Sequence, residues 1–218
     1  MPPGYTYSVL VLNQSTATGD VCLYQTVATA PLGAVPVAWL TRRATPRTRL
    51  TFQWMTDYAF VWSSSAATLE PGALITASQV WPADLTSTNQ ITLTYGGGTF
   101  TFANQTAGSA GSLVMVQVST IPARLGVAGI GMADQTTTIV PMQPNVTLRF
   151  DPRPRYWIAF GSFTAGEVID VESAGATEIV FPANVTSMSA LLGADNIWTI
   201  APTASANRRM AAASRHAL

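Results

Sequence analysis

Short segments in which hydrophobic and polar residues alternate follow one another along nearly the whole chain. The clearest examples are residues 5–12, 49–54, 91–95, 113–118 and 146–150. A period of two residues places successive side chains on opposite faces of a strand, whereas a helix requires a period of about 3.6. The segments are rich in Thr, Val, Ile, Leu and aromatic residues, and Gly, Pro, Asn or Asp bound them. The pattern predicts an all-β fold with antiparallel sheets, as in sandwiches and barrels.

Two hairpins can be placed from their turn residues. Three consecutive glycines, residues 96–98, separate the alternating segments 92–95 and 99–102. Residues 193–196, Gly-Ala-Asp-Asn, separate segments 188–192 and 197–200 in the same way. Turns of this kind require a positive φ angle, which Gly and Asn adopt most readily.

The two halves of the chain carry similar segments in the same order. The segments 49–52 and 58–62, with Asp57 between them, are matched by 146–150 and 156–160, with Asp151 between them. Other matched pairs are 13–15 with 104–106, 21–25 with 113–117, 71–75 with 165–169, 81–84 with 181–184 and 99–102 with 197–200. The offset grows from 91 residues (Asn13 to Asn104) to 100 (Pro82 to Pro182), as loop insertions would produce. Chance similarity between Thr-rich strands is the alternative.

The repeat predicts two tandem, internally duplicated β-sandwich-like units that pack together. The first unit spans residues 5–103, the second 104–200, and residues 201–218 form a linker and a basic tail. We expect the same strand order in both units. Asp57 and Asp151 are expected at equivalent turns, where a carboxylate commonly caps the backbone.

The charge content is low and balanced. Charged residues make up 10% of the chain, against about 25% in an ordinary soluble domain. The 11 basic residues are all arginines, and 11 carboxylates cancel them. Such a chain lacks the basic field of a nucleic-acid-binding protein. The absence of lysine also excludes Schiff-base chemistry and a P-loop.

Other catalytic and cofactor-binding patterns are missing as well. The single cysteine, Cys22, lies in a strand-like segment and is interpreted as a small buried hydrophobic residue rather than a reactive thiol. The single histidine, His216, is third from the end, so no Ser-His-Asp or Cys-His arrangement is expected. Gly126, Gly129 and Gly131 do not form a dinucleotide fingerprint, because no helix follows them. We therefore expect a non-enzymatic protein without cofactor or metal.

Three groups of side chains remain as candidate sites, each with a simpler structural explanation. The carboxylates of Glu167, Asp170 and Glu172 could bind calcium, or they could lie on a solvated face of a strand. Two Arg-Pro loops could grip phosphate or carboxylate groups, or could keep a hydrophobic protein soluble. They contain Arg42, Arg43, Arg47 and Arg49 in one half, and Arg149, Arg153 and Arg155 in the other. The aromatic residues Trp54, Tyr58, Trp62, Trp81 and Trp157 could form a sugar-stacking platform or belong to the core.

The sequence contains no signal peptide and no run of 18 apolar residues. These absences predict a cytoplasmic protein without a membrane span. Export by a route that needs no signal peptide stays open.

Several segments resemble the RhiA-type rhizosphere-expressed proteins of bacteria. They are residues 21–26, 37–40, 52–62, 77–84, 129–132, 156–161 and 195–200. The resemblance spans the chain up to residue 200 and rests on aromatic and turn positions. It implies no settled activity, cofactor or catalytic residue.

Two functional hypotheses follow from these observations. The first is a structural protein that self-associates into an ordered homo-oligomer, filament or array, because zero net charge and uncharged strands favour association. Its candidate assembly residues are Thr92, Thr94 and Thr99, with Arg208, Arg209 and Arg215 of the tail. The alternative is a lectin-like β-sandwich module that binds a carbohydrate or another small ligand, by analogy with β-sandwich lectins.

Overall fold

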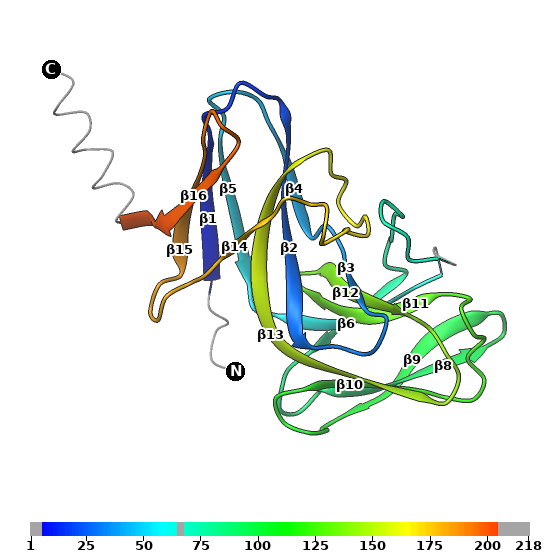
Figure 1. Ribbon diagram of the computed structural model, residues 1–218. Helices are drawn as coiled ribbons and strands as arrows, with labels where there is room; N and C mark the ends of the chain where they lie inside the picture. The colour runs from blue at the N-terminus through cyan, green and yellow to red at the C-terminus, as the bar shows by residue number, and fades with distance from the viewer. Residues whose placement is uncertain (1–5, 65–67, 205–218) are drawn as a thin grey trace, which may run out of the picture.

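The computed structural model describes residues 6–64 and 68–204, and within them every regular element up to Pro202 is a β-strand (Figure 1). The all-β prediction is confirmed. In the described ranges no helix is long and apolar enough to cross a membrane. The strands are β1 (Thr6–Asn13), β2 (Gly19–Thr29), β3 (Val35–Pro36), β4 (Leu40–Ala44), β5 (Arg49–Met55), β6 (Tyr58–Ser63), β7 (Gln79–Ala83), β8 (Gln90–Gly96), β9 (Thr99–Thr106), β10 (Leu113–Gln117), β11 (Val127–Met132), β12 (Gln135–Pro141), β13 (Val146–Gly161), β14 (Thr177–Ile179), β15 (Ser187–Leu192) and β16 (Trp198–Pro202).

Both hairpins predicted from the turn residues are present. Strands β8 and β9 pair across Gly97 and Gly98, whose φ angles are 60° and 83°. Strands β15 and β16 pair across a turn in which Asn196 has a φ of 60°. Strand β16 continues to Pro202, so it includes the first two residues of the predicted linker.

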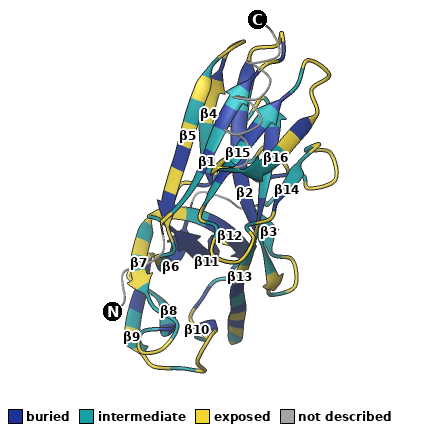
Figure 2. Cartoon of the chain, turned by 90° about the vertical axis from the view of Figure 1, so that its left-hand side faces the viewer, coloured by how far each residue is buried: buried dark blue, intermediate teal, exposed yellow. Residues whose placement is uncertain are grey.

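Three sheets build two sandwiches, because the 7-stranded sheet contributes to both. We call them the upper and lower sandwich after their places in Figure 1. In the upper sandwich the sheet β16-β15-β1-β5 packs on β4-β2-β13-β14. Val9, Phe52 and Met188 of the first sheet share one hydrophobic cluster with Leu23 and Ile158 of the second. Side chains therefore alternate between core and solvent, as the striped strand β5 shows in Figure 2.

The lower sandwich consists of the strands β13-β10-β8-β9 facing the sheet β3-β12-β11-β6-β7. Its core contains Leu93, Met115 and Phe150 from the first sheet, and Phe60 and Ile130 from the second. Strand β11 is buried along all six residues, because a second cluster with Val127 and Ile139 covers its other face.

Two chain segments cross between the sandwiches. Strand β13 pairs with β10 through residues 146–150 and then with β2 through residues 151–161, with a register shift between Asp151 and Pro154. The other crossing is the connection from β5 to β6. The Tyr58 hydroxyl donates a 3.0 Å hydrogen bond to the carbonyl oxygen of Pro152, which ties the two crossings together.

Each sandwich takes strands from both halves of the chain. Strands β1, β2, β4 and β5 of the first half lie with β14, β15, β16 and the end of β13. Strands β3 and β6 to β9 lie with β10, β11, β12 and the start of β13. The predicted division at residues 103/104 therefore does not coincide with the spatial division between the sandwiches.

The same pairing pattern occurs in both sandwiches. Strand β1 pairs parallel with β15 and antiparallel with β5, just as β10 pairs parallel with β8 and antiparallel with β13. Strand β2 lies between β4 and β13, just as β11 lies between β12 and β6. This pattern places β10 opposite β1 and β11 opposite β2. It differs from the match between residues 21–25 and 113–117 drawn from the sequence.

Candidate functional site

Strand β9 is a sheet edge with neither charge nor proline, and a bulge at Asn104, whose φ is 50°, interrupts its pairing with β8. An edge strand exposes unpaired backbone N–H and C=O groups, and proteins normally block such edges with charges or proline. Among the described strands at sheet ends, β9 is alone in having neither. The other ends carry Arg42 and Arg43 (β4), Arg49 (β5), Glu178 (β14), Pro36 (β3), Pro82 (β7) and Pro202 (β16).

The predicted assembly threonines share the outer face of this region. Thr94 lies opposite Thr101 on β9 and donates a 3.1 Å hydrogen bond to its carbonyl oxygen. Thr92 and Thr94 are half-buried on the inner strand β8, whereas Thr99 and Thr101 are exposed on the edge. The structure thus brings Thr92, Thr94 and Thr99 together. Arg208, Arg209 and Arg215 of the predicted set, like His216, lie outside the described residues.

A cleft of about 350 Å³ lies where the upper sandwich meets the crossings. It falls within the size range of small-molecule pockets, about 300–1,000 Å³. Its lining comes from the start of β1, the β5–β6 connection, the middle of β13 and the segment that begins with β14. The lining residues are Tyr7, Thr56, Tyr58, Pro154, Arg155, Tyr156, Glu178, Ile179, Val180 and Phe181.

Two of these residues, Arg155 and Glu178, form an ion pair on the sheet face that carries Trp157, opposite to the face that carries Tyr156. The Arg155 Nε and Nη2 atoms donate to the two carboxylate oxygens of Glu178 at 2.7 and 2.5 Å. The guanidinium also lies 5.3 Å from the centre of the Trp157 ring. The hydrogen bond from Arg155 holds the pKa of Glu178 below its usual range, so this carboxylate is charged at neutral pH.

The five aromatic residues singled out in the sequence do not form one platform. Trp54 and Trp62 are buried in different cores, and Trp81 donates to the Gln105 side chain at 2.7 Å. Trp157 packs in another cluster beside Tyr24. Of the five, Tyr58 alone lines the cleft, where it joins aromatic residues that the sequence did not single out: Tyr7, Tyr156 and Phe181.

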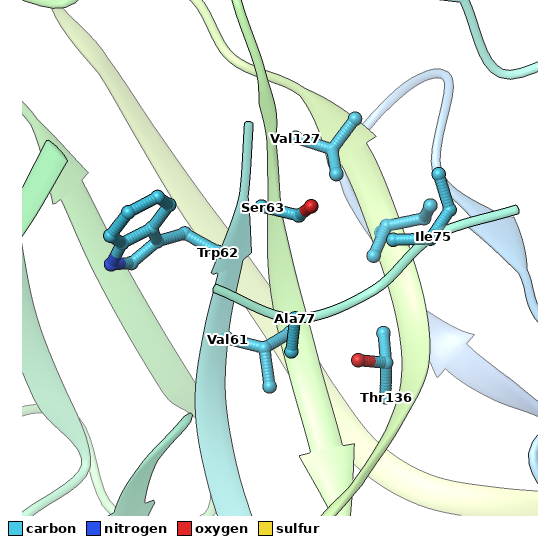
Figure 3. A pocket seen from close by; sticks show the side chains of 8 residues that line it. Val61, Trp62, Ser63, Ile75, Ala77, Val127 and Thr136 are labelled. Carbon is cyan, nitrogen blue, oxygen red and sulfur yellow. The ribbon is translucent and has the colours of Figure 1, made fainter. Parts of the chain in front are cut away.

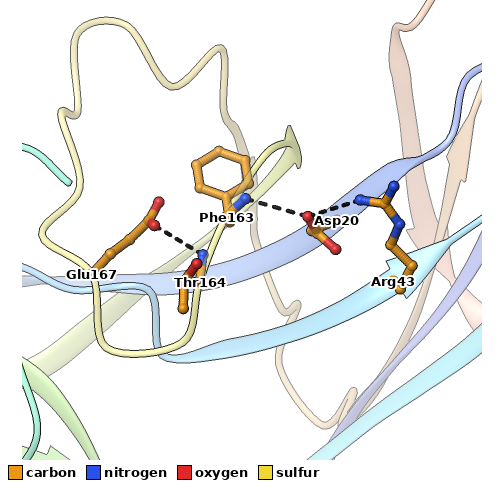
Figure 4. Close-up of polar contacts among 5 residues, drawn as sticks. All are labelled: Asp20, Arg43, Phe163, Thr164 and Glu167. Atoms are coloured by element: carbon orange, nitrogen blue, oxygen red, sulfur yellow. Dashed lines mark hydrogen bonds and ion pairs between the residues drawn. The ribbon is translucent and has the colours of Figure 1, made fainter. Parts of the chain in front are cut away.

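The two arginine loops do not converge on one ligand. Arg43 pairs with Asp20 at 3.2 Å, and Figure 4 shows this contact. Asp20 lies opposite Gly161, six residues along β13 from Arg155, or about 20 Å at about 3.3 Å per residue. Arg153 binds both carboxylate oxygens of Asp151, so this carboxylate holds a guanidinium rather than capping the backbone.

The sequence led us to expect that the acidic segment forms a solvated strand face. In the structure it belongs instead to the loop between β13 and β14. Glu167 accepts a 2.9 Å hydrogen bond from the backbone N–H of Thr164 (Figure 4). Asp170 accepts from the backbone of Glu172 and the hydroxyl of Ser173. Local turns account for these carboxylates, and the described residues contain no group of side chains able to hold a metal ion.

Another, narrower space lies between β6, β11 and the segment before β7 (Figure 3). Its walls include Val61, Val127 and Ile75, and it has no room for a water molecule. It is a packing gap of the core rather than a binding site.

We expect Cys22 to resist alkylation in the folded protein. The side chain is fully buried, and burial raises the pKa of the thiol to about 12. At pH 8 only about one molecule in ten thousand carries the reactive thiolate. Mass spectrometry after iodoacetamide treatment should show adducts only when guanidinium is present, with glutathione as the reactive control. Rapid labelling of the folded chain would contradict the buried, structural role.

Fold and surface together define an all-β protein of two sandwiches that share a strand, with a sheet edge free of charge and proline and a small aromatic cleft. The RhiA family model matches residues 4–203. "Protein RhiA" of Rhizobium leguminosarum bv. viciae is 31% identical over 203 residues, which cover 91% of this chain and 87% of that protein. No solved structure matches the chain. The chain belongs to the RhiA family.

Proposed function

We propose that the protein is a non-enzymatic structural protein that self-associates into an ordered homo-oligomer through strand β9. The observation that carries the proposal is the composition of this edge, which has eight residues and neither charge nor proline. Net charge is zero, and residues 85–123, which contain β8, β9 and β10, have no charged side chain. No electrostatic repulsion therefore opposes the approach of two such edges.

The geometry favours antiparallel pairing of β9 with β9 of a second copy. Such a contact is symmetric, because the same residues lie on both sides of the twofold axis. It joins the β13-β10-β8-β9 sheets of two molecules into one continuous sheet. Phe100 and Phe102 stay in their own cores, while Thr99 and Thr101 meet their counterparts on the outer face. Growth into a filament or array requires a further contact on another part of the surface.

We also infer that the chain is internally duplicated, with the second parts of the two repeats exchanged between sandwiches. The repeated pairing pattern supports this inference. Strands β1, β2, β4 and β5 of the first repeat would complete the upper sandwich with the end of β13, β14, β15 and β16 of the second. Strands β10, β11, β12 and the start of β13 would complete the lower sandwich with β6 to β9. The sequence matches of 49–52 with 146–150, 58–62 with 156–160 and 99–102 with 197–200 agree with this pattern, whereas the match of 21–25 with 113–117 does not.

We expect the double substitution Thr99→Lys and Thr101→Lys to abolish or strongly weaken self-association. Two lysines on the edge of each copy place like charges opposite one another in the antiparallel pair. Sedimentation velocity over a range of concentrations measures the effect, and thermal unfolding confirms that the fold is kept.

Thr51→Lys is the matched control for this experiment. Thr51 is likewise exposed on an end strand, β5, where Arg49 already protects the edge. Assembly of this variant should equal that of the original protein. A parent protein that remains monomeric at high concentration and moderate salt would overturn the proposal, and equal weakening by both substitutions would remove β9 from it.

A further inference from the structure

The cleft at the sandwich junction is the open end of the upper core. Five of its lining residues belong to the hydrophobic cluster of the upper sandwich or pack against it, so their side chains face one space. They are Tyr7, Tyr58, Tyr156, Ile179 and Phe181. Tyr156 and Ile179 are buried and form the floor, whereas the other three are half-exposed and form the walls.

Neighbouring rings hold these walls in place. Tyr7 and Phe181 meet edge to face, with ring centres 4.9 Å apart and planes at 80°. The Tyr156 ring lies 6.2 Å from Tyr7 and 5.6 Å from Phe181, and the buried Trp54 ring lies 6.0 Å from each of them. Aromatic rings favour offset or edge-to-face contacts with centres about 4.5–7 Å apart. A further ring that enters the cleft would therefore continue an arrangement that is already present.

Among the described lining residues, no charged group faces these rings. Arg155 and Glu178 border the cleft, but each directly precedes a residue of its floor in the strand and therefore points to the opposite face. Burial raises the pKa of Tyr58, with a smaller contribution from Tyr7, and burial also raises the pKa of Tyr156. These phenols are neutral at pH 7. A charged ligand would lose water in the cleft without meeting an opposite charge.

One hydroxyl group of the aromatic lining remains available to a ligand. The hydroxyls of Tyr58 and Tyr156 already form hydrogen bonds with other groups of the protein. The Tyr7 hydroxyl has no such partner within the described part of the chain. A tyrosine hydroxyl can both donate and accept a hydrogen bond, so it can bind either a hydroxyl or a carbonyl group.

The volume of the cleft suits two fused rings. An apolar cavity of about 150 Å³ holds one benzene ring, and this cleft measures about 350 Å³. We propose that the cleft binds a neutral bicyclic aromatic molecule that carries a hydroxyl or carbonyl group. The rings of the ligand would pack against Tyr7 and Phe181 above Tyr156, and its polar group would bind the Tyr7 hydroxyl. This site is independent of the β9 edge.

Saturation-transfer NMR with the full chain tests the proposal. The probes are naphthol and acetylnaphthalene, with decahydronaphthol as the saturated counterpart and naphthoate and naphthylmethylamine as the charged ones. At least one neutral aromatic probe should bind with a dissociation constant of about 1 mM or below. The saturated alcohol should bind at least about threefold more weakly than naphthol, because it cannot form contacts between aromatic rings.

Two substitutions in the walls test the two kinds of contact. Tyr7→Phe should weaken naphthol binding by about threefold to tenfold, because one hydrogen bond is lost while the ring stays. Phe181→Leu should weaken it by a similar factor, because a ring contact is lost while the side chain stays apolar. Thermal unfolding confirms that both variants keep the fold.

Tyr95→Phe and Phe163→Leu are the matched controls. Tyr95 is a half-buried tyrosine that packs on Phe100 in the lower sandwich, and Phe163 is a half-buried phenylalanine of another cluster. Both substitutions should leave the affinity for naphthol unchanged. The variant with Thr99→Lys and Thr101→Lys should also bind naphthol as the parent does, which separates this result from that of self-association.

Several outcomes would overturn the proposal. They are the absence of binding by both neutral aromatic probes, equal affinity for the saturated alcohol, tighter binding of a charged probe, and binding that survives both Tyr7→Phe and Phe181→Leu. If no probe binds and Tyr7→Phe weakens self-association, the cleft is an interface between copies of the chain, and the proposal is likewise wrong.

Discussion

Cutting the chain between Ala110 and Gly111 should leave two fragments, neither of which folds as a monomer. In residues 1–110 the remaining strand pairs are β1–β5, β2–β4, β6–β7 and β8–β9. In residues 111–218 they are β10–β13, β11–β12, β13–β14 and β15–β16. Apart from β13, which pairs with β10 and with β14 along different stretches, all pairings that join these pairs into larger sheets run between the fragments. Isolated two-stranded ribbons are marginally stable at best in water.

Mixing or co-expressing the fragments should restore the native fold, since the cut lies in an exposed loop. Asn89 holds both sides of the cut, through hydrogen bonds from its side-chain amide to the carbonyl oxygens of Ser109 and Ser112. Near-ultraviolet circular dichroism and amide NMR dispersion measure folding. The control is an uncut chain with a short Gly-Ser insertion at the same point, which should fold normally.

Three outcomes of the fragment experiment can be distinguished. Folding only in the mixture supports exchanged halves. Folding of one fragment as a dimer also supports the duplication, because each copy would supply the strands that the other lacks. A stable folded monomer from either fragment would contradict the exchanged arrangement.

The alternation of side chains predicted individual strands well but not their partners. Residues 49–54 alternate in the structure as they do in the sequence, because one face of β5 packs on a core and the other faces solvent. Alternation does not depend on which strand lies alongside. The sequence therefore could not reveal that β1 pairs with β15, 179 residues away in the contact of Ser8 with Ser187.

The cleft was only partly predictable for a similar reason. Tyr58 stood out because it lies in an aromatic segment, but Tyr7 and Phe181 reach the cleft only because β1 and the segment after β14 meet the crossings. No local spacing connects positions so far apart in the chain. The prediction of a strand face for the acidic segment was wrong, because the backbone there makes only isolated bridges, such as that between Val37 and Val168.

Gly126, Gly129 and Gly131, which do not form a dinucleotide fingerprint, have a packing role in and beside β11. A Cβ atom at Gly126 or Gly131 would lie 2.5 Å from a backbone oxygen of a neighbouring segment. At Gly129 it would lie 1.9 Å from the carbonyl oxygen of Thr138 and 2.8 Å from the Cα of Ile139. Glycine in a strand commonly marks such a close approach of backbones.

We therefore expect Gly129→Ala to destabilise the protein by about 3 kcal/mol or more, because β11 and β12 must separate where both faces of the sheet are packed. At about 2–4 °C per kcal/mol for a chain of this size, the melting temperature should fall by about 6–12 °C. Gly96→Ala is the control, since its Cβ would have no atom within 4 Å, and it should change stability by less than about 0.5 kcal/mol. Differential scanning calorimetry of both variants decides the matter. If Gly129→Ala melted at the same temperature as Gly96→Ala, β11 and β12 would not be in close backbone contact. The sheet β3-β12-β11-β6-β7 would then need another arrangement.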